Sequence, residues 1–330
     1  MSKIKMAQIG TNRTSHGRDI FECISSMPDI FEVVGYALPE DERNRFPEKL
    51  DVFEGYREMS VEEILSDKSI QAVTIETEEV NLTKYALLAA KAGKHIHIEK
   101  PGGFCHREFE ELIEEVKSRK IVLHFGYMYR HNPYISKLLK RINDGELGNI
   151  ISVEAQMNTP HPYEIRKWLE SVPGGSMFFL GCHLIDLIVQ IQGFPENIIP
   201  FNRTTGVDGL NAKDFGMAVL EYKNGVSFAK TCSVERGGFS RRQLVVTGTK
   251  GTVEVRPLEF YVEYPDIYTE YKEIFSTEWT ANSEFNRTEY FDRYKAMMKH
   301  FANHIKDGIT DNYDYELKLH ECVLKASGMM

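Results

Sequence analysis

Two segments of the sequence carry side chains suited to moving a proton. Lys100 follows a short β-rich run, between Glu99 and Pro101. A lysine that is partly buried, or close to another cation, loses its proton more easily and then serves as a general base or acid. His183 and Asp186 are three residues apart in a segment with helical spacing, so they share one helical face. In a common cleft with the lysine, this pair suits proton transfer; otherwise His183 is a core residue held by Asp186.

A tight turn after the first apolar run has part of a nucleotide-binding motif. Residues 9–17 read IGTNRTSHG, where dinucleotide-binding folds have G-x-G-x-x-G. Gly10 is present, whereas Asn12 and Ser15 stand at the other two glycine positions. Asparagine tolerates left-handed backbone better than most residues, and a small serine allows close packing of helix on strand. The motif alone fits a strand-to-helix turn without a ligand equally well.

Two further segments offer side chains for a sugar. Tyr127 and Arg130 lie in GYMYRHNP, which suits either a polar stacking surface or the filling of a junction between domains. Arg166 and Trp168 lie in HPYEIRKW. An arginine there can hold a carboxylate or hydroxyls, and a tryptophan can stack on a pyranose face or anchor its loop in the core. The basic segment around Arg242 is a solvated face or a contact for an acidic sugar.

The elements that must position these residues follow from the apolar pattern. Strands are predicted at 4–9, 31–38, 70–77, 95–99 and 121–126, alternating with helices at 17–27, 81–92 and 106–118. Such alternation predicts a parallel sheet, whose ligands bind at the carboxyl ends of the strands. Beyond residue 126 we predict a helix at 181–191, strands at 149–157, 215–222, 226–234, 243–247 and 252–256, and long helices at about 288–307 and 313–327. We therefore expect an α/β protein with two domains, residues 1–125 and 126–330, and the C-terminal helices could pack either in the second domain or back on the first.

Composition excludes several classes of protein. The chain has 330 residues, of which 40 are basic and 49 acidic, and the net charge of −9 argues against a nucleic-acid partner. Five scattered cysteines without a C-x-x-C pair indicate neither a disulfide framework nor a zinc site, so we expect no metal. The N-terminus lacks the pattern of a signal peptide, and no apolar run reaches the roughly 18 residues that span a bilayer. We expect a cytoplasmic protein without a membrane partner.

Five blocks together resemble the Gfo/Idh/MocA oxidoreductases, the glucose-fructose oxidoreductase and inositol dehydrogenase family. They are AGKHIHIEKP (92–101), GYMYRHNP (126–133), ELGNIISV (146–153), GCHLIDL (181–187) and VTGTKGTVEV (246–255). The resemblance implies an N-terminal Rossmann domain with a doubly wound parallel sheet, and an α+β domain with an open, mostly antiparallel sheet. In this family that sheet commonly joins subunits, so a homodimer or homotetramer is expected. It also implies hydride exchange between a nicotinamide cofactor and a sugar or cyclitol.

The same resemblance implies roles for individual residues. Lys100 matches the family's catalytic lysine and His183 its catalytic histidine. One of them would take the hydroxyl proton as hydride leaves the same carbon, and Lys100 would stabilise the alkoxide by its charge. The residues expected to bind the cofactor are Gly10, Thr11, Asn12, Arg13, Leu38, Thr77, Glu99, Lys100 and Pro101. Those expected to bind substrate are Tyr127, Arg130, Arg166, Trp168 and Asp186.

Departures from the family pattern fall mainly in the cofactor-facing segments. Phe179 stands where many members have an aspartate four residues before the histidine. Leu38 stands where an acidic residue often binds the ribose, with Glu40 and Asp41 just beyond it. The family's A-T-P-N is here residues 76–79, ETEE. These acids would disfavour the 2′-phosphate of NADP, so NAD is favoured.

Three functions remain open on the sequence. The leading hypothesis is an NAD(P)-dependent dehydrogenase of a sugar, cyclitol or sugar derivative. The second is a glycoside-cleaving enzyme that keeps NAD bound and forms a transient keto-sugar, without net redox change. The third is a non-catalytic protein that senses a sugar or dinucleotide, which the altered glycine motif and Phe179 favour and which Lys100 and His183 oppose.

Overall fold

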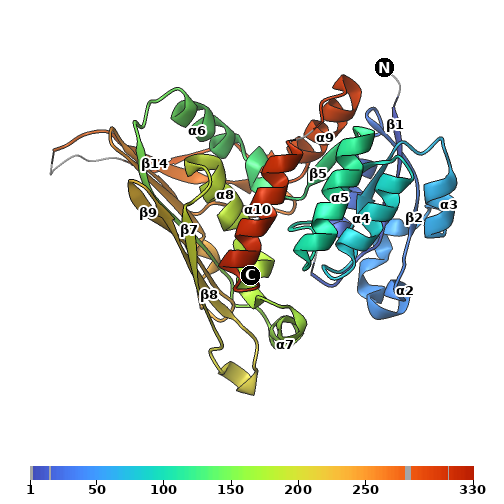
Figure 1. The fold of residues 1–330 in the computed structure, drawn as a ribbon, viewed down its shortest axis with the longest axis horizontal. Coiled ribbons are helices and arrows are strands. Elements are labelled where there is room, and N and C mark those ends of the chain that lie inside the picture. The colour runs from blue at the N-terminus through green and yellow to red at the C-terminus, as the bar shows by residue number, and fades with distance from the viewer. Residues whose placement is uncertain (1–2, 15, 279–283, 311) are drawn as a thin grey trace. The chain divides into compact units, whose positions relative to one another are not determined.

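The computed structural model describes residues 3–14, 16–278, 284–310 and 312–330, so the expected role of Ser15 lies outside the described residues. The chain forms two compact units (Figure 1). The first unit comprises Met1–Met128 and Tyr294–His320, and the second comprises Tyr129–Arg293 and Glu321–Met330. Each unit is described below by itself.

The first unit contains a parallel sheet of five strands in the described residues, in the order β2-β1-β3-β4-β5. The strands are β1 (Ile4–Ile9), β2 (Phe31–Ala37), β3 (Ala72–Ile75), β4 (His95–Ile98) and β5 (Leu123–Phe125). All four residues of β3, Ala-Val-Thr-Ile, are buried, as expected for a parallel strand covered on both faces. The parallel sheet predicted from the sequence is confirmed.

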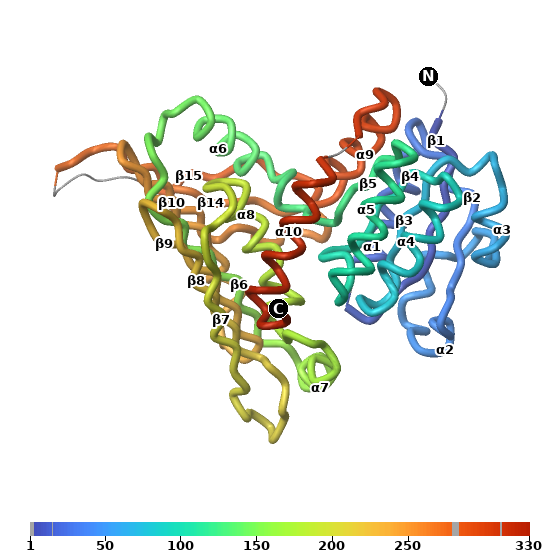
Figure 2. Tube along the Cα trace, in the orientation of Figure 1, coloured from blue at the N-terminus to red at the C-terminus, as the bar shows by residue number. Residues whose placement is uncertain are grey.

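Helices cover both faces of this sheet. They are α1 (Gly17–Ser25), α2 (Glu42–Arg45), α3 (Val61–Ser66), α4 (Leu82–Lys91), α5 (His106–Arg119), α9 (Lys295–Asp307) and the first part of α10 (Tyr313–Ala326). On one face, Phe109 of α5 packs on Phe125 of β5, with ring centroids 5.8 Å apart. On the other, Phe301 of α9 lies 5.4 Å from the ring of His124 in β5. The chain thus returns from its far end to complete the first unit, as its colour in Figure 2 shows.

The second unit is built on a mixed sheet of eight strands in the described residues. Its order is β15-β14-β11-β10-β6-β9-β8-β7, and β6 and β9 form its parallel pair. The strands are β6 (Ile150–Asn158), β7 (Asn197–Arg203), β8 (Phe215–Tyr222), β9 (Gly225–Cys232), β10 (Gln243–Gly248), β11 (Thr252–Val255), β14 (Glu270–Ile274) and β15 (Asn286–Arg287). The mostly antiparallel sheet expected from the sequence is confirmed. Strands β8 and β9 form a hairpin in which Tyr222 pairs with Gly225.

The remaining elements of this unit lie beside the sheet. They are α6 (Pro133–Asn143), α7 (Tyr163–Trp168), α8 (Cys182–Gln192) and the small sheet β12 (Phe260–Glu263), β13 (Asp266–Tyr268) and β16 (Phe291–Asp292). Helix α8 follows a π-helical turn, Met177–Gly181, and packs on β6 and β9. Its apolar sequence is explained by burial of nine of its eleven residues.

One predicted helix begins later than the sequence suggested. The helix expected from residue 288 starts at Lys295. Before it, the N–H of Thr288 donates to the carbonyl of Thr269, and Phe291 pairs with Ile267 of β13. Strand pairing with a distant segment therefore overrides the local helical pattern. None of the helices in the described part of the chain is long and apolar enough to cross a membrane.

Candidate active site

The turn after β1 is held by the side chain of Asn12. The amide of Asn12 donates to the carbonyl of Thr77 at 2.9 Å, and its oxygen accepts the N–H of Thr14 at 2.7 Å. Gly10 has φ +91°, and a Cβ there would lie 2.4 Å from the Cγ2 of Thr77. Asn12 is not among the described residues with positive φ, so its contribution to the turn is hydrogen bonding rather than left-handed backbone. Gly10, Asn12 and Thr77, all expected to bind the cofactor, lie together at this turn.

The side chain of Glu42 reaches this turn from α2, and the sequence did not single this residue out. Its Oε2 accepts the N–H of Thr11 at 3.1 Å, and the side chain is fully buried. Burial raises the pKa of Glu42 to about 9, opposed by the Thr11 hydrogen bond. The sequence pointed instead to Glu40, whose carboxylate binds Lys84 and Tyr85 at 2.6 and 2.7 Å. Residues 40–45 read EDERNR, and nothing in their spacing shows that Glu42 is the acid that becomes buried.

The other expected cofactor residues of this region differ in their surroundings. Leu38 packs against the apolar cluster of Phe21, Tyr36 and Phe53. Arg13 is exposed, with its guanidinium 6.0 Å from the ring centroid of Phe46. The N-cap residue of helix α1, His16, makes no side-chain cap hydrogen bond with the described residues. A helix start after β1, next to a glycine that permits close approach, is the arrangement that receives a pyrophosphate in dinucleotide-binding folds.

Lys100 follows β4, where its side chain is 3% exposed and meets carboxylates. Its Nζ lies 3.3 Å from Glu99 Oε1. Burial raises the pKa of Glu79 to about 7 against the opposing charge of Lys100. Burial and then the charge of Glu99 raise the pKa of Glu76. The burial that sequence analysis required for Lys100 is present, together with a cluster of acids. Pro101 follows it through a cis peptide bond.

In the second unit, His183 is buried on α8. Its ring meets the ring of Tyr129 edge-on, with centroids 5.1 Å apart. Asp186, on the next turn of α8, accepts hydrogen bonds from Arg130 Nε at 2.9 and 3.1 Å, and Arg130 Nη2 lies 2.7 Å from Asp186 Oδ1. The structure thus pairs Asp186 with Arg130. Lys100 and His183 belong to different units, and each is described within its own.

Arg166, Trp168 and Phe179 lie in one region of the second unit. Arg166 is buried; it donates to the carbonyl of His161 at 3.1 Å and pairs with Asp208. Trp168 is half-buried, and its ring meets that of Phe179 edge-on at 5.2 Å. Burial, followed by the charges of Arg242 and Arg166, lowers the pKa of His161 to about 4. Phe179 therefore fills the position of the family's aspartate with an aromatic contact.

Tyr127 and Arg242 are both buried; the sequence left a stacking surface and a filled domain junction open for Tyr127, and a solvated face was expected around Arg242. Tyr127 is 2% exposed in the first unit, with its ring 6.1 Å from that of Phe125. Arg242 is 6% exposed in the second unit, pairs with Glu259, and donates to Thr159 Oγ1 at 2.7 Å. The solvated basic face expected around Arg242 is therefore wrong for this residue. The buried carboxylate of Glu259, 17 residues further along the chain, neutralises the charge of Arg242, and the sequence around Arg242 does not show this pairing.

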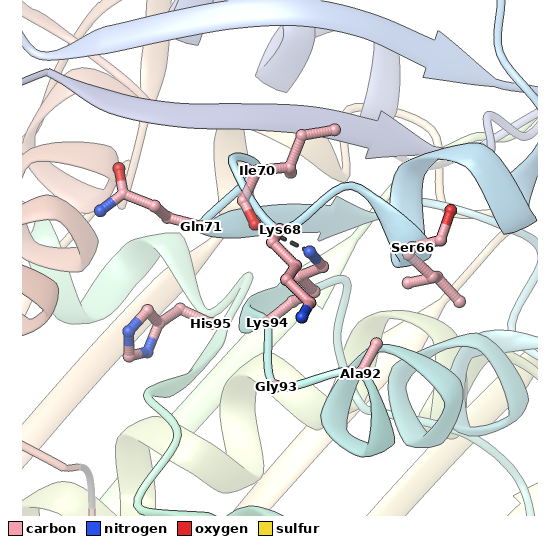
Figure 3. A pocket seen from close by; sticks show the side chains of 9 residues that line it. Ser66, Lys68, Ile70, Gln71, Ala92, Gly93, Lys94 and His95 are labelled. Atoms are coloured by element: carbon pink, nitrogen blue, oxygen red, sulfur yellow. Dashed lines mark hydrogen bonds between the residues drawn. The ribbon is translucent and has the colours of Figure 1, made fainter.

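A pocket of about 630 Å³ opens elsewhere in the first unit (Figure 3). It is lined by Leu65, Ser66, Lys68, Ile70, Gln71, Ala92, Gly93, Lys94 and His95. Gln71 precedes β3 and His95 begins β4, so the pocket lies at the amino ends of these strands. Lys94 donates there to the carbonyls of Asp67 and Ile70, at 2.6 and 2.9 Å. Gly10 and Lys100 lie at the opposite, carboxyl ends, where parallel sheets bind their ligands.

Models of two protein families match the two halves of the chain. The model described as "Oxidoreductase family, NAD-binding Rossmann fold" matches residues 4–127. The model described as "GFO/IDH/MocA C-terminal domain" matches residues 135–254. Together the matches include most of both sheets described above.

Individual relatives agree with these matches. Trans-1,2-dihydrobenzene-1,2-diol dehydrogenase of Bos taurus is 29% identical over 231 residues, 68% of this chain and 66% of that protein. The enzyme of the same name from Sus scrofa is 28% identical over 85% of this chain and 82% of its own. Myo-inositol 2-dehydrogenase of Thermotoga maritima is 24% identical over 59% and 60%. The crystal structure of KijD10, a 3-ketoreductase from Actinomadura kijaniata in complex with NADP and TDP-benzene, has the same fold, with a TM-score of 0.79, 18% identity, and coverage of 98% of this chain and 96% of that one.

Proposed function

Because the chain belongs to the Gfo/Idh/MocA family of oxidoreductases, we propose that it moves a hydride between a nicotinamide cofactor and a hydroxyl-bearing carbon of a sugar, cyclitol or related diol. The observation that carries this proposal is the buried Lys100–Glu99 pair, 3.3 Å apart, at the carboxyl end of β4. A buried lysine beside a carboxylate can exchange a proton with a substrate hydroxyl and pass it on. The relatives named for diol and inositol oxidation support a substrate with a secondary alcohol.

The residues of the first unit fit a dinucleotide. The Gly10 turn, fixed by Asn12 on Thr77, and the start of α1 would hold the pyrophosphate. When bound, a nicotinamide supplies the hydride acceptor. This chain's own residues supply the proton chemistry: Lys100 takes the hydroxyl proton and its charge stabilises the developing alkoxide, and His183 is the second proposed acid–base group.

Within this proposal the cofactor is NAD rather than NADP. A 2′-phosphate needs an arginine near the end of β2. The two arginines that follow β2 are each paired with an acid, Arg43 with Glu58 and Arg45 with Glu78. The buried Glu42 adds a further carboxyl group close to the turn. Calorimetry of the full chain with NAD and with NADP tests this preference; tighter binding of NADP would contradict it.

The activity is tested by absorbance at the reduced-nicotinamide band, with NAD and a panel of polyols that includes myo-inositol and a trans-dihydrodiol. We expect Lys100→Ala and His183→Ala each to lower turnover by about 10²-fold or more, the usual effect of a positioned acid–base group. Lys91→Ala, an exposed lysine of α4, is the matched control and keeps wild-type turnover. Near-wild-type turnover in both site variants would overturn these assignments.

Two outcomes would redirect the proposal. Cofactor that co-purifies with the chain, together with glycoside cleavage and no net NADH, would indicate a redox-neutral cleavage reaction. A folded chain that binds neither NAD nor NADP would indicate a sensor that has lost the cofactor, in line with Phe179 at the position of the family's aspartate.

We also propose that the sheet of the second unit joins two copies of the chain. Strand β7 is the last strand of this sheet and exposes Ile199 and Phe201, at 37% and 42%. Apolar side chains on an edge strand favour association with another strand or sheet. Light scattering of the purified chain is expected to give the mass of a dimer or tetramer, and Phe201→Lys is expected to lower it.

A further inference from the structure

A row of polar side chains crosses the buried sheet of the first unit. Strands of a parallel sheet normally present apolar residues to both covering layers. Here Gln8 of β1 pairs in register with Thr74 of β3, Thr74 with His97 of β4, and His97 with His124 of β5. Register partners point to the same face of a sheet, so the four side chains form one row. Gln8, Thr74 and His97 are fully buried, and His124 is 5% exposed.

Hydrogen bonds join two pairs of neighbours in the row. Thr74 Oγ1 donates to Gln8 Oε1 at 3.1 Å. The Nδ1 atoms of His97 and His124 are 2.8 Å apart, so one ring donates an N–H to the other. The second nitrogen of His97, Nε2, lies 3.7 Å from Glu76 Oε1. His97 thus uses one nitrogen towards Glu76 and the other towards His124.

One end of the row leads to the acids beside Lys100. Glu76 and Glu99 directly follow the paired residues Ile75 and Ile98, so they are neighbours at the carboxyl ends of β3 and β4. Glu99 Oε1 lies 3.3 Å from Lys100 Nζ. The sequence of groups from the lysine is therefore Glu99, Glu76, His97 and His124. All are buried in the first unit.

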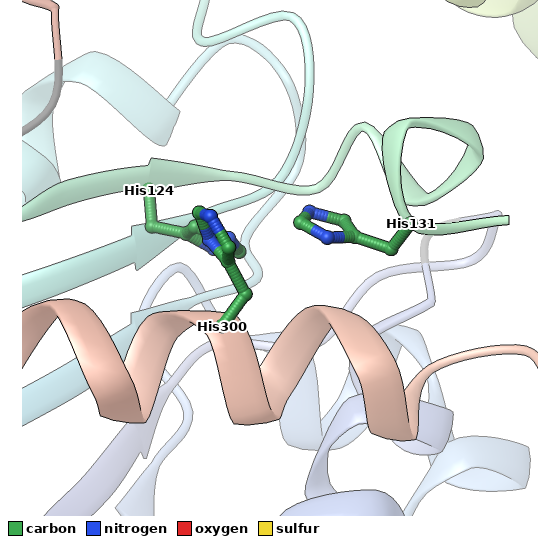
Figure 4. A group of neighbouring side chains, drawn as sticks. All are labelled: His124, His131 and His300. Atoms are coloured by element: carbon green, nitrogen blue, oxygen red, sulfur yellow. The ribbon is translucent and has the colours of Figure 1, made fainter. Parts of the chain in front are cut away.

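The other end leads to helix α9. The rings of His124 and His300 have centroids 5.4 Å apart, and their nitrogens lie within 4.8 Å of each other. Figure 4 shows His300 rising from the helix towards His124 on the strand. His304, one turn further on, has its ring 3.9 Å from that of His300. Both histidines of α9 are partly exposed, so the row ends where solvent reaches the unit.

We propose that Glu76, His97, His124 and His300 form a proton relay between the Lys100 site and solvent at α9. The inference rests on the proposed oxidation, in which each hydride removed from an alcohol leaves one proton to be released. A proton entering at Glu76 binds His97 on Nε2 while the proton on Nδ1 passes to His124, whose other nitrogen releases one towards His300. Each imidazole gains one proton and loses one, and no electrons move. Reduction would run the same path inwards.

The surroundings keep the imidazoles suited to this role. Burial lowers the pKa of His97 to about 3, so the ring is neutral and passes protons without holding a charge. Ionisable groups of the first unit beside the row include Glu76, Glu99 and Lys100 after the strands, Asp19 on α1, and His300 and His304 on α9. Asp19 lies close enough to Glu76 to raise its pKa. Phe301 packs on His97 and His124, with its ring centroid 5.9 and 5.4 Å from theirs.

The test uses the full chain, labelled with ¹⁵N-histidine and, at the backbone, ¹⁵N-isoleucine. Solvent exchange of the His97 ring proton is measured by NMR, with the backbone amide of Ile98 as the internal reference. An amide in a core strand exchanges only when the structure opens. A working relay lets the buried ring proton exchange about 10²-fold faster than this amide, whereas exchange at the amide's rate would overturn the proposal.

Variants of the exposed end then identify the path. His300→Leu and His300→Gln are both expected to slow ring-proton exchange of His97 by about 10-fold or more, because neither side chain passes a proton on. Having two substitutions at a partly exposed position keeps the test valid if one of them fails to fold. His95→Leu, on the same strand but outside the row, is the control and leaves exchange unchanged. Unchanged exchange in both His300 variants would also overturn the proposal.

Activity separates this inference from the proposed function. If a polyol is oxidised, His300→Gln is expected to lower kcat in dilute buffer, and added imidazole is expected to restore it, which a purely structural role would not produce. Fast exchange in a chain that oxidises no polyol would contradict the proposed function while the relay stands. Oxidation without fast exchange, or without rescue, would contradict the relay alone.

Discussion

The N–H of Thr11 donates to Oε2 of Glu42 at 3.1 Å, so a buried carboxyl group is hydrogen-bonded to the turn that is expected to hold a nucleotide. Burial raises the pKa of Glu42 to about 9, which keeps this group protonated near neutral pH. The same holds in part for Glu79, with a pKa of about 7. The acids at this edge of the sheet therefore carry less negative charge at neutral pH than their number suggests.

We expect Glu42→Gln to stabilise the fold at alkaline pH. The native state holds the Glu42 proton between about pH 4.5 and pH 9, whereas the unfolded chain releases it, so this group costs stability as pH rises through that window. Each unit of pKa shift corresponds to about 1.4 kcal/mol and pH 8 lies about 3.5 units above the ordinary pKa, so the gain should reach about 5 kcal/mol at pH 8 and fall to about 1 kcal/mol at pH 5. Urea unfolding at both pH values measures it. An equal effect at both would contradict the buried, protonated Glu42.

Stability of the wild-type chain should pass through a maximum at about pH 6. Burial lowers the pKa of His97 to about 3, and burial is also the main cause that lowers the pKa of His161 and His320 to about 4. Below about pH 6.5 these histidines bind protons in the unfolded chain but stay neutral in the native state, so stability falls as pH falls. From about pH 4.5 upwards the acids described above act in the opposite direction, and above about pH 6.5 they act alone. Urea midpoints from pH 4.5 to 9 test this profile; a steady rise to pH 9 would refute it.

Gly10→Ala should cost more than the same change at Gly93. Both glycines have positive φ, +91° and +77°, so alanine is strained at each by about 1 kcal/mol. A Cβ at Gly93 meets nothing within 4 Å, whereas one at Gly10 lies 2.4 Å from Thr77 Cγ2. Overpacking adds about 1–3 kcal/mol at Gly10. Unfolding in urea should show the larger loss of stability for Gly10→Ala. Calorimetry with NAD should show a loss of cofactor affinity for Gly10→Ala and none for Gly93→Ala.

Asp186→Asn should destabilise the second unit. Asp186 is 1% exposed and accepts a bidentate contact from Arg130, which is itself partly exposed. Removing one charge of a buried pair typically costs 3–5 kcal/mol, and the exposure of Arg130 reduces this to about 2–3 kcal/mol. Asp144→Asn, at an exposed carboxylate after α6, serves as the control. Equal urea midpoints for the two variants would show that the pair contributes nothing to stability.

Phe179→Ala should expose the indole of Trp168. The two rings meet edge-on at 5.2 Å, and Phe179 is 6% exposed. Loss of a buried phenylalanine costs about 3–5 kcal/mol and leaves a cavity beside the indole. The fluorescence of Trp168 should shift to the red, measured in a Trp279→Phe background so that Trp168 is the sole tryptophan. An unchanged emission maximum would show that Phe179 does not shield it.

The sequence by itself determined the fold class and the edge of the sheet at which chemistry was expected. Short apolar runs such as Ala72–Ile75, followed by helices with regular spacing, specify parallel strands, and strand ends locate Gly10 and Lys100. The Asn-Gly pair at 224–225 specified a hairpin, because few dipeptides adopt its backbone. These features depend on residues close together in the chain, so local physics decides them.

Only the tertiary structure decided which polar residues are buried and with whom they pair. Glu42, His97, His124 and Arg242 look like ordinary charged or polar residues in sequence, and each is buried by segments far away in the chain. Glu259 lies 17 residues from Arg242, and Asp186 lies 56 residues from Arg130. The helix expected at residue 288 begins at Lys295 for the same reason, since a distant strand pairs with the segment before it. Burial and pairing depend on contacts between remote segments, and no local pattern encodes them.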